Sequence, residues 1–167
     1  VVLNGKRIGM TKAAKTPAEF NVTPYLCEGE NLLAVRVYRW HDGSYMEDQD
    51  FWRFTGIARE VYLYARPQAH IADLFITPDL VNNYQDGTLE VKLNAVGAKG
   101  ETVMFSLKDK EGKEVAAQTA KVGGNGEVKV NFDIKNPLKW TAETPNLYTL
   151  YTTLMDGKQV ALLVPTT

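Results

Sequence analysis

The segment from Trp40 to Arg53 concentrates side chains that could bind a sugar. Its fourteen residues hold four carboxylates, two tryptophans, a tyrosine, a phenylalanine and an arginine. Aromatic rings stack on the C–H face of a pyranose, and carboxylates accept hydrogen bonds from its hydroxyl groups. This composition predicts a loop that contacts carbohydrate.

Other interpretations of this loop remain open from its residues alone. An acidic run is usually a solvated surface, and Trp40 and Trp52 could simply close the end of a β-sandwich. A calcium loop is disfavoured, because the oxygen-bearing residues lack the alternate spacing and closing glutamate of an EF-hand. The elements that hold the loop are therefore considered next.

Apolar residues at every second position recur through most of the chain, which is typical of half-buried antiparallel strands. The alternation is clearest at residues 88–95, 103–107 and 128–134. About seven such strands are expected between Ile71 and Val164. Since Cys27 is the only cysteine, this pattern predicts an immunoglobulin-like β-sandwich without a disulfide.

Residues that tolerate positive φ separate these strands. They lie at Asp86-Gly87, Asp109 to Gly112, Gly123 to Gly126, and Asp156-Gly157. The glycine-rich stretch from Gly123 to Gly126 is interpreted as a turn, not as a phosphate-binding loop.

The first third of the chain predicts only part of a second β-sandwich. Strands are expected at 31–38 and 57–65, and Asn4-Gly5 predicts a hairpin turn between strands at 1–3 and 7–10. So few strands would leave open edges and an uncovered apolar face. We therefore expect further strands before Val1.

A domain boundary is predicted between Arg66 and Pro67. Proline ends the strand that begins at Ile57, and a new alternating pattern follows it. The chain is accordingly divided into an incomplete sandwich at 1–66 and a complete one at 67–167.

Charge and hydropathy exclude several classes of partner. The formal net charge of -1 gives no reason to expect nucleic acid or an anionic membrane as a partner. No signal peptide begins the chain, and no run approaches the ~18 apolar residues that would cross a bilayer. A soluble protein of the cytoplasm or periplasm is expected.

Several segments resemble the β-galactosidases of glycoside hydrolase family two. The run DGSYMEDQDFWRFTGIAREVYLY resembles the end of that family's first domain, a jelly roll, and LNGKRIGMTKAAKTPAEFNVTPYL and GENLLAVRVYRW extend the likeness. NPLKWTAETPNLYTL resembles the close of its second, immunoglobulin-like domain. The resemblance therefore implies an all-β chain: a partial jelly-roll β-sandwich, then an immunoglobulin-like antiparallel β-sandwich.

The resemblance also implies a role for Asp50. It matches an aspartate that reaches from the first domain into the active site, contacts the galactose 6-hydroxyl and helps to hold a sodium ion. The neighbouring residues of the motif are expected to support the loop: Glu47, Asp48, Phe51, Trp52 and Arg53. His41 stands where the family has serine, and neither His41 nor His70 is expected to be catalytic.

The chain itself is expected to be catalytically inactive. Retaining glycoside hydrolysis needs two carboxylates about 5–5.5 Å apart, and the resemblance implies that both are glutamates of a (β/α)₈ barrel that also binds magnesium. No stretch here alternates strands with amphipathic helices. Glu47 and Asp50 are no substitute, because the sequence shows no cleft that would raise the pKa of one of them.

The resemblance thus implies a parent protein that hydrolyses terminal β-galactosides with retention. In that parent, a homo-oligomer by expectation, the remaining domains of the same polypeptide would complete the site around the galactoside. Two alternatives stay open: a stand-alone carbohydrate-binding module, and a structural module whose immunoglobulin-like part contacts other proteins.

Overall fold

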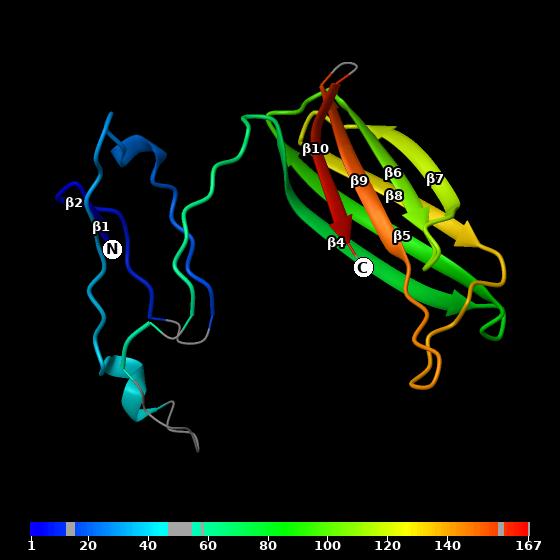
Figure 1. The fold of residues 1–167 in the computed structure, drawn as a ribbon, viewed down its shortest axis with the longest axis horizontal. Coiled ribbons are helices and arrows are strands. Elements are labelled where there is room, and N and C mark those ends of the chain that lie inside the picture. The colour runs from blue at the N-terminus through cyan, green and yellow to red at the C-terminus, as the bar shows by residue number, and fades with distance from the viewer. Residues whose placement is uncertain (13–15, 47–54, 58, 157–158, 167) are drawn as a thin grey trace. The chain divides into compact units, whose positions relative to one another are not determined.

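The computed structural model describes residues 1–12, 16–46, 55–57, 59–156 and 159–166. The chain forms two compact units, Val1–Leu63 and Tyr64–Thr167 (Figure 1). The domain ranges expected from the sequence, 1–66 and 67–167, stay predictions. None of the helices in the part of the chain that the structure describes is long and apolar enough to cross a membrane.

In the described part of the second unit there are seven strands, and their pairings are antiparallel. One sheet has the order β4-β5-β8 and the other has the order β10-β9-β6-β7. The strands are β4 (His70–Val81), β5 (Asp86–Val96), β6 (Thr102–Lys108), β7 (Glu114–Lys121), β8 (Glu127–Ile134), β9 (Thr149–Asp156) and β10 (Gln159–Thr166). The predicted all-β fold is confirmed.

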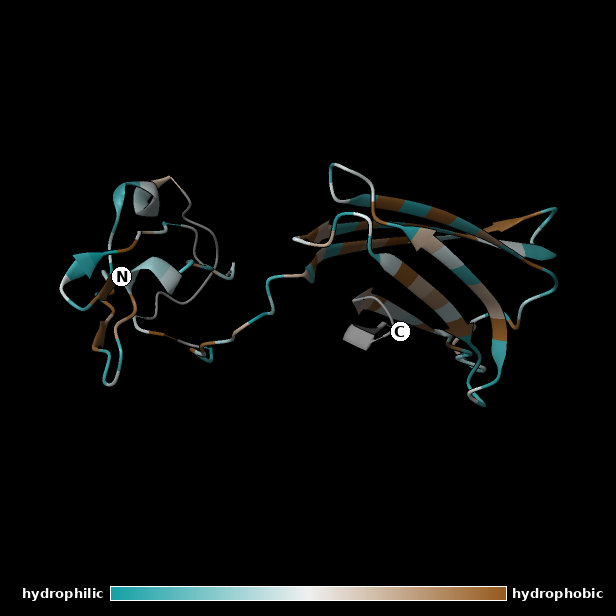
Figure 2. Ribbon diagram, turned by 90° about the horizontal axis from the view of Figure 1, so that it is seen from above, coloured by the Kyte–Doolittle hydropathy of each residue, from teal (hydrophilic) through white to brown (hydrophobic). Residues whose placement is uncertain are grey.

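The core of this unit lies between the two sheets. Alternate residues of β5, β6, β8 and β9 are buried, and hydrophobic and hydrophilic bands alternate along strands in Figure 2. Val91 on β5 meets Val103 and Phe105 on β6 and Leu154 on β9 in one buried cluster. This packing between the sheets gives the second unit a core of its own.

The turn between β4 and β5 differs from the one expected at Asp86-Gly87. Asp86 already pairs with Val81, and the turn is formed by residues 82–85. Asn82, Asn83 and Tyr84 there have positive φ, a conformation that asparagine tolerates better than most residues. The pKa of Asp86 is lowered to about 2 by a hydrogen bond from Lys135 and others from Asn82 and the Asn136 backbone.

The first unit contains a small sheet of order β2-β1-β3. β1 (Val2–Leu3) and β2 (Lys6–Arg7) are joined by the predicted Asn4-Gly5 turn, in which both residues have positive φ. β3 (Leu33–Ala34) pairs with the other edge of β1. The described residues of the unit also form two short 3₁₀ helices, η1 (Thr23–Tyr25) and η2 (Asp42–Tyr45).

Two strands predicted for the first unit are formed only in part or not at all. Only Leu33–Ala34 of the expected strand at 31–38 pairs with a neighbour, and residues 59–65 belong to no strand. A ladder requires backbone N–H and C=O groups on an adjacent strand. Both segments carry the alternating pattern, but among the described residues only Leu33–Ala34 forms a ladder, with β1.

Replacing Thr152 with valine tests the core of the second unit. The Thr152 side chain is fully buried, and among the described residues its Oγ1 has no hydrogen-bond partner. Valine keeps the shape and removes the unpaired hydroxyl, so Thr152→Val should raise the free energy of unfolding by about 1 kcal/mol. Urea unfolding followed by circular dichroism measures this change.

Thr153→Val is the matched control, because Thr153 is the next residue on β9 and is only half-buried. It should shift the unfolding midpoint little. A fall in stability with Thr152→Val would show that the hydroxyl has a partner after all.

Candidate functional site

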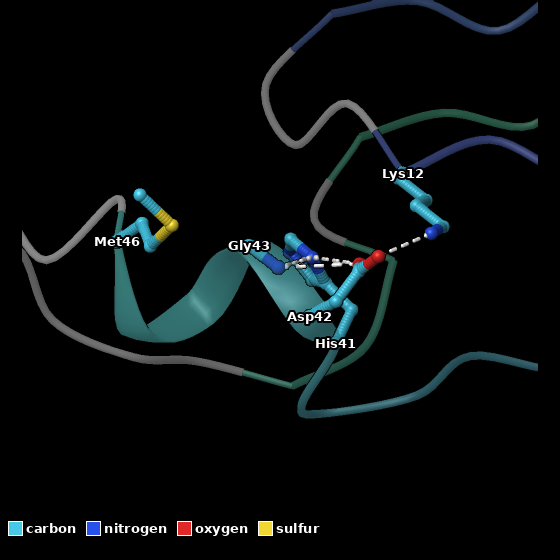
Figure 3. A pocket seen from close by; sticks show the side chains of 5 residues that line it. All are labelled: Lys12, His41, Asp42, Gly43 and Met46. Carbon is cyan, nitrogen blue, oxygen red and sulfur yellow. Dashed lines mark hydrogen bonds and ion pairs between the residues drawn. The ribbon is translucent and has the colours of Figure 1, made fainter.

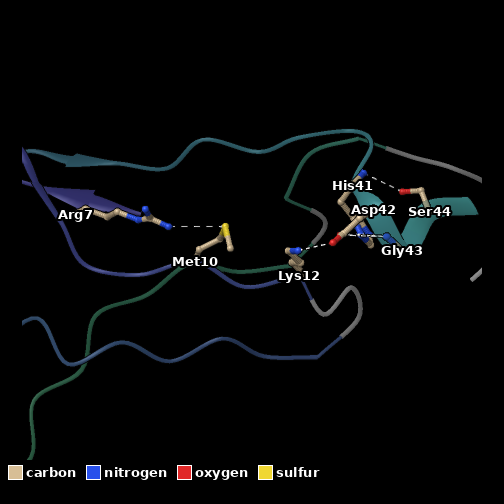
Figure 4. Close-up of polar contacts among 7 residues, drawn as sticks. All are labelled: Arg7, Met10, Lys12, His41, Asp42, Gly43 and Ser44. Atoms are coloured by element: carbon tan, nitrogen blue, oxygen red, sulfur yellow. Dashed lines mark hydrogen bonds and ion pairs between the residues drawn. The ribbon is translucent and has the colours of Figure 1, made fainter. Parts of the chain in front are cut away.

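The described part of the proposed sugar loop begins with the short helix η2. His41 is its N-cap: His41 Nδ1 accepts a hydrogen bond from the Gly43 backbone at 3.1 Å, and the His41 backbone donates to Ser44 Oγ at 3.1 Å (Figure 4). These two bonds satisfy donors that the start of a helix would otherwise leave unpaired. His41 therefore positions the start of η2, and the expectation that it is not catalytic stays a prediction.

An ion pair fixes the same end of the loop to the start of the chain. Lys12 Nζ lies 2.6 Å from Asp42 Oδ2, and both side chains are exposed (Figure 3). The hydrogen bond from Lys12 and its positive charge lower the pKa of Asp42. Asp42 therefore stays ionised and unsuited to the role of general acid at neutral pH.

These residues line an open hollow at one side of η2. Its walls are formed by Lys12, His41, Asp42, Gly43 and Met46 (Figure 3). The ammonium group donates hydrogen bonds and the carboxylate accepts them, so the hollow can contact hydroxyl groups. Among the described residues that line the hollow, Asp42 is the one carboxylate, whereas retaining glycoside hydrolysis requires two.

The residues expected to contact or support the sugar lie outside the described residues. These are Asp50, with its proposed sugar and sodium contacts, and the supporting residues Glu47, Asp48, Phe51, Trp52 and Arg53. Their assignments stay predictions. The structure describes the loop up to Met46 and again from Thr55, where the chain leads toward the second unit.

The His70 side chain contacts two backbone carbonyl oxygens near the start of the second unit. Its Nδ1 lies 2.9 Å from the Pro67 carbonyl oxygen and 3.2 Å from that of Gln68.

Within the described ranges, no three His, Cys, Asp or Glu side chains are grouped so that they could hold a metal ion.

Sequence reasoning missed the part played by Lys12. The lysine lies 30 residues before Asp42, and no local pattern connects the two. An aspartate at the start of a helix is a recognisable signal, since negative charge there is favoured. Nothing in the sequence marks which cation approaches it.

Comparison with known families divides the chain in two. Residues 1–67 match the family described as "Glycosyl hydrolases family 2, sugar binding domain". Residues 69–164 match the one described as "Glycosyl hydrolases family 2". The second match alone covers more than half of the chain.

Curated relatives include several β-galactosidases. The chain is 46% identical to the enzyme of Clostridium acetobutylicum over 151 residues, which are 90% of this chain and 17% of the relative. It is 42% identical to the enzyme of Streptococcus thermophilus over 166 residues, 99% of this chain and 16% of the relative. The chain thus spans about one sixth of the length of these relatives.

Solved structures include a β-glucuronidase of Bifidobacterium dentium complexed with coumarin-3-O-glucuronide. It superposes with a TM-score of 0.77 and 24% identity, covering 98% of this chain and 33% of that one. At this identity the likeness concerns the fold alone.

The ion pair predicts how the Asp42 carboxyl group titrates. Lys12→Met removes the cation that favours the carboxylate, so the pKa of Asp42 should rise toward its ordinary value of 3.8. The carboxyl carbon shift of Asp42, followed by NMR against pH, measures the change. Lys6→Met serves as control, because Lys6 is an exposed lysine of β2. An Asp42 pKa that is the same in wild type and Lys12→Met would contradict the assigned pair.

Proposed function

The chain belongs to glycoside hydrolase family 2, and from this premise we propose that it is a non-catalytic segment of a longer β-galactosidase. The longer protein would hydrolyse terminal β-galactosides with retention, and this segment would supply scaffold and one loop of the sugar site. The observation that carries the proposal is the 46% identity to a curated β-galactosidase over 90% of the chain.

The choice of galactoside depends on the curated relatives rather than on the fold. Identity to the β-galactosidases of Clostridium acetobutylicum and Streptococcus thermophilus is 46% and 42%, whereas the β-glucuronidase that shares the fold is 24% identical. The acidic and aromatic motif from Glu47 to Arg53 supports the same choice, because it resembles that of the family's galactosidases.

The lowered pKa of Asp42 agrees with a supporting role of this chain in glycoside hydrolysis. A retaining glycosidase needs one carboxyl group that stays protonated until it donates to the leaving group. Asp42 has the opposite property, because Lys12 lowers its pKa. We assign the catalytic glutamates and the magnesium ion to a barrel in the remainder of the polypeptide, as the family resemblance implies.

Within the proposed site, Asp50 would accept a hydrogen bond from the galactose 6-hydroxyl and share a sodium ion. A carboxylate can do both, since it offers several lone pairs and one negative charge. The cap at His41 and the pair between Lys12 and Asp42 would hold the entry of the loop that carries Asp50. Fixing the ends of a loop reduces the entropy lost on binding.

The exposed apolar side chains of the first unit favour the interpretation that further polypeptide covers them. Large apolar side chains are exposed there, among them Leu32, Val61 and Leu63, while Leu3 is the one buried apolar residue among the described residues of this unit. Contiguous exposed apolar groups usually mark surfaces that another element covers. We assign that covering to further parts of the same polypeptide.

Asp50→Ala in the longer enzyme tests the proposal. Loss of a charge-assisted hydrogen bond to the 6-hydroxyl should lower kcat/KM for 4-nitrophenyl β-D-galactoside about 10- to 150-fold, since such bonds contribute about 1.5–3 kcal/mol. For the corresponding 6-deoxy substrate, β-D-fucoside, the same variant should lose much less. Steady-state kinetics on both substrates gives the comparison.

Asp48→Ala is the matched control, because Asp48 lies in the same motif and is assigned no direct sugar contact. It should lower kcat/KM less than Asp50→Ala, and similarly for both substrates. If Asp50→Ala left kcat/KM for the galactoside unchanged within about twofold, the proposed role would be contradicted. Equal losses of kcat/KM on the two substrates would contradict it as well.

A further inference from the structure

Two Asn-Gly dipeptides lie in turns of this chain, at Asn4-Gly5 and at Asn125-Gly126. This dipeptide is chemically labile, because glycine has no side chain that would keep its backbone nitrogen away from the carbonyl carbon of the asparagine side chain. Since the same dipeptide occurs twice, the structure around each one determines which of them reacts.

The reaction consumes only water. At the second dipeptide, the Gly126 nitrogen would bond to Asn125 Cγ as the bond from Cγ to Nδ2 breaks, and ammonia would leave with the proton of the Gly126 N–H group. Water then opens the cyclic imide at either of its carbonyl carbons, which gives aspartate or isoaspartate. Nothing is oxidised or reduced, and the product carries an additional carboxylate.

The Asn4 side chain is held by residues that are distant in the sequence. Its Nδ2 donates to the Tyr25 carbonyl at 3.0 Å and to Asn31 Oδ1 at 2.8 Å, and its Oδ1 accepts from the Leu32 backbone at 2.9 Å. The residue is half-buried. Attack by the Gly5 nitrogen requires the amide to rotate, which would break these hydrogen bonds together.

The Asn125 side chain is exposed, and its hydrogen-bond partners among the described residues lie in its own turn. Asn125 Nδ2 donates to Glu127 Oε2 at 2.6 Å, and Asn125 Oδ1 accepts from the Glu127 backbone at 3.1 Å. The attacking atom, the Gly126 nitrogen, donates to the Gly123 carbonyl at 3.0 Å. Opening this one turn therefore frees the reacting atoms, and local opening of an exposed turn costs little free energy.

The fold requires the glycine that makes Asn125 reactive. Gly126 has a φ of +87°, and a Cβ at this position would lie 2.5 Å from the Ala95 carbonyl oxygen. The Gly126 carbonyl also accepts a hydrogen bond from the Ala95 backbone at 2.8 Å, which connects the turn to β5. A side chain at this position would strain the start of β8, so the labile dipeptide cannot be removed there without cost to the fold.

We propose that Asn125, in the connection between β7 and β8 (Figure 1), is a site of spontaneous deamidation, whereas Asn4 is protected. The inference goes beyond the proposed function and does not depend on it. The new carboxylate would lie beside Glu127, whose Oε2 accepts a hydrogen bond from the Asn125 amide. An attractive contact would thus become a repulsion between like charges.

Peptide mapping of the 167-residue chain by mass spectrometry tests the proposal. Cleavage after Lys6, Lys121 and Lys129 places the two dipeptides in separate peptides. After incubation of the folded chain at mildly alkaline pH, aspartate plus isoaspartate should form at Asn125 at least about tenfold faster than at Asn4, because freeing Asn4 costs more free energy.

The same chain unfolded in guanidinium chloride is the control for sequence effects. Both dipeptides are then released from the structure, so their rates of deamidation should agree within about threefold. Equal rates at the two sites in the folded chain would overturn the proposal. A rate at Asn125 in the folded chain that is about a hundredfold or more below its rate in the unfolded chain would overturn it as well.

Asn125→Gln is the matched variant. Glutamine keeps the amide group, but its longer side chain forms a cyclic imide with the next nitrogen far more slowly, so the acidic product should disappear from this peptide. Circular dichroism of the variant controls for folding, and its unfolding midpoint should match that of the wild type because the side chain is exposed. Acidic product that persists in the variant would assign the reaction to another residue and overturn the proposal.

Discussion

Burial of alternate side chains between two facing sheets is the constraint on which the rest of this structure depends. In the second unit, inward residues such as Val91, Phe105 and Leu154 meet in one core, and the polar residues between them face water. Once one sheet covers the apolar face of the other, full-length strands and regular ladders follow. Connections such as the turn at 82–85 can then take unusual conformations.

Within its described residues, the first unit has one small sheet and no second sheet that covers it. Its sheet consists of strands of two residues each, and apolar side chains such as Leu32 and Leu63 remain exposed. Polar contacts hold the described residues around η2, above all the pair between Lys12 and Asp42 and the cap at His41. A loop anchored in this way is suited to complete a binding site whose other groups lie on another element.

Much of the fold could be predicted from the sequence, because alternation and turn chemistry are local signals. The strand from Leu89 to Ala95 and the Asn4-Gly5 turn formed as expected. Alternation at 57–65 also predicted a strand, but pairing depends on a neighbour that a local pattern cannot supply. Nor can alternation alone tell which of the two faces of a strand is buried.

The candidate site was less predictable for the same physical reason. Asp42 at the start of a helix is a local feature, whereas its partner Lys12 comes from a distant segment that folding brings near. The importance assigned to Asp50 comes from family resemblance, since no composition rule distinguishes it from Glu47 or Asp48.

The central claim is that this chain carries one part of a sugar site and that the remainder of the polypeptide carries the other. Isothermal titration with a non-hydrolysable thiogalactoside, taken to tens of millimolar (about tenfold above a millimolar dissociation constant), tests it most directly. The account predicts no binding heat for the 167-residue chain and a saturable signal for the longer protein. Binding by the 167-residue chain with millimolar affinity or better would contradict it.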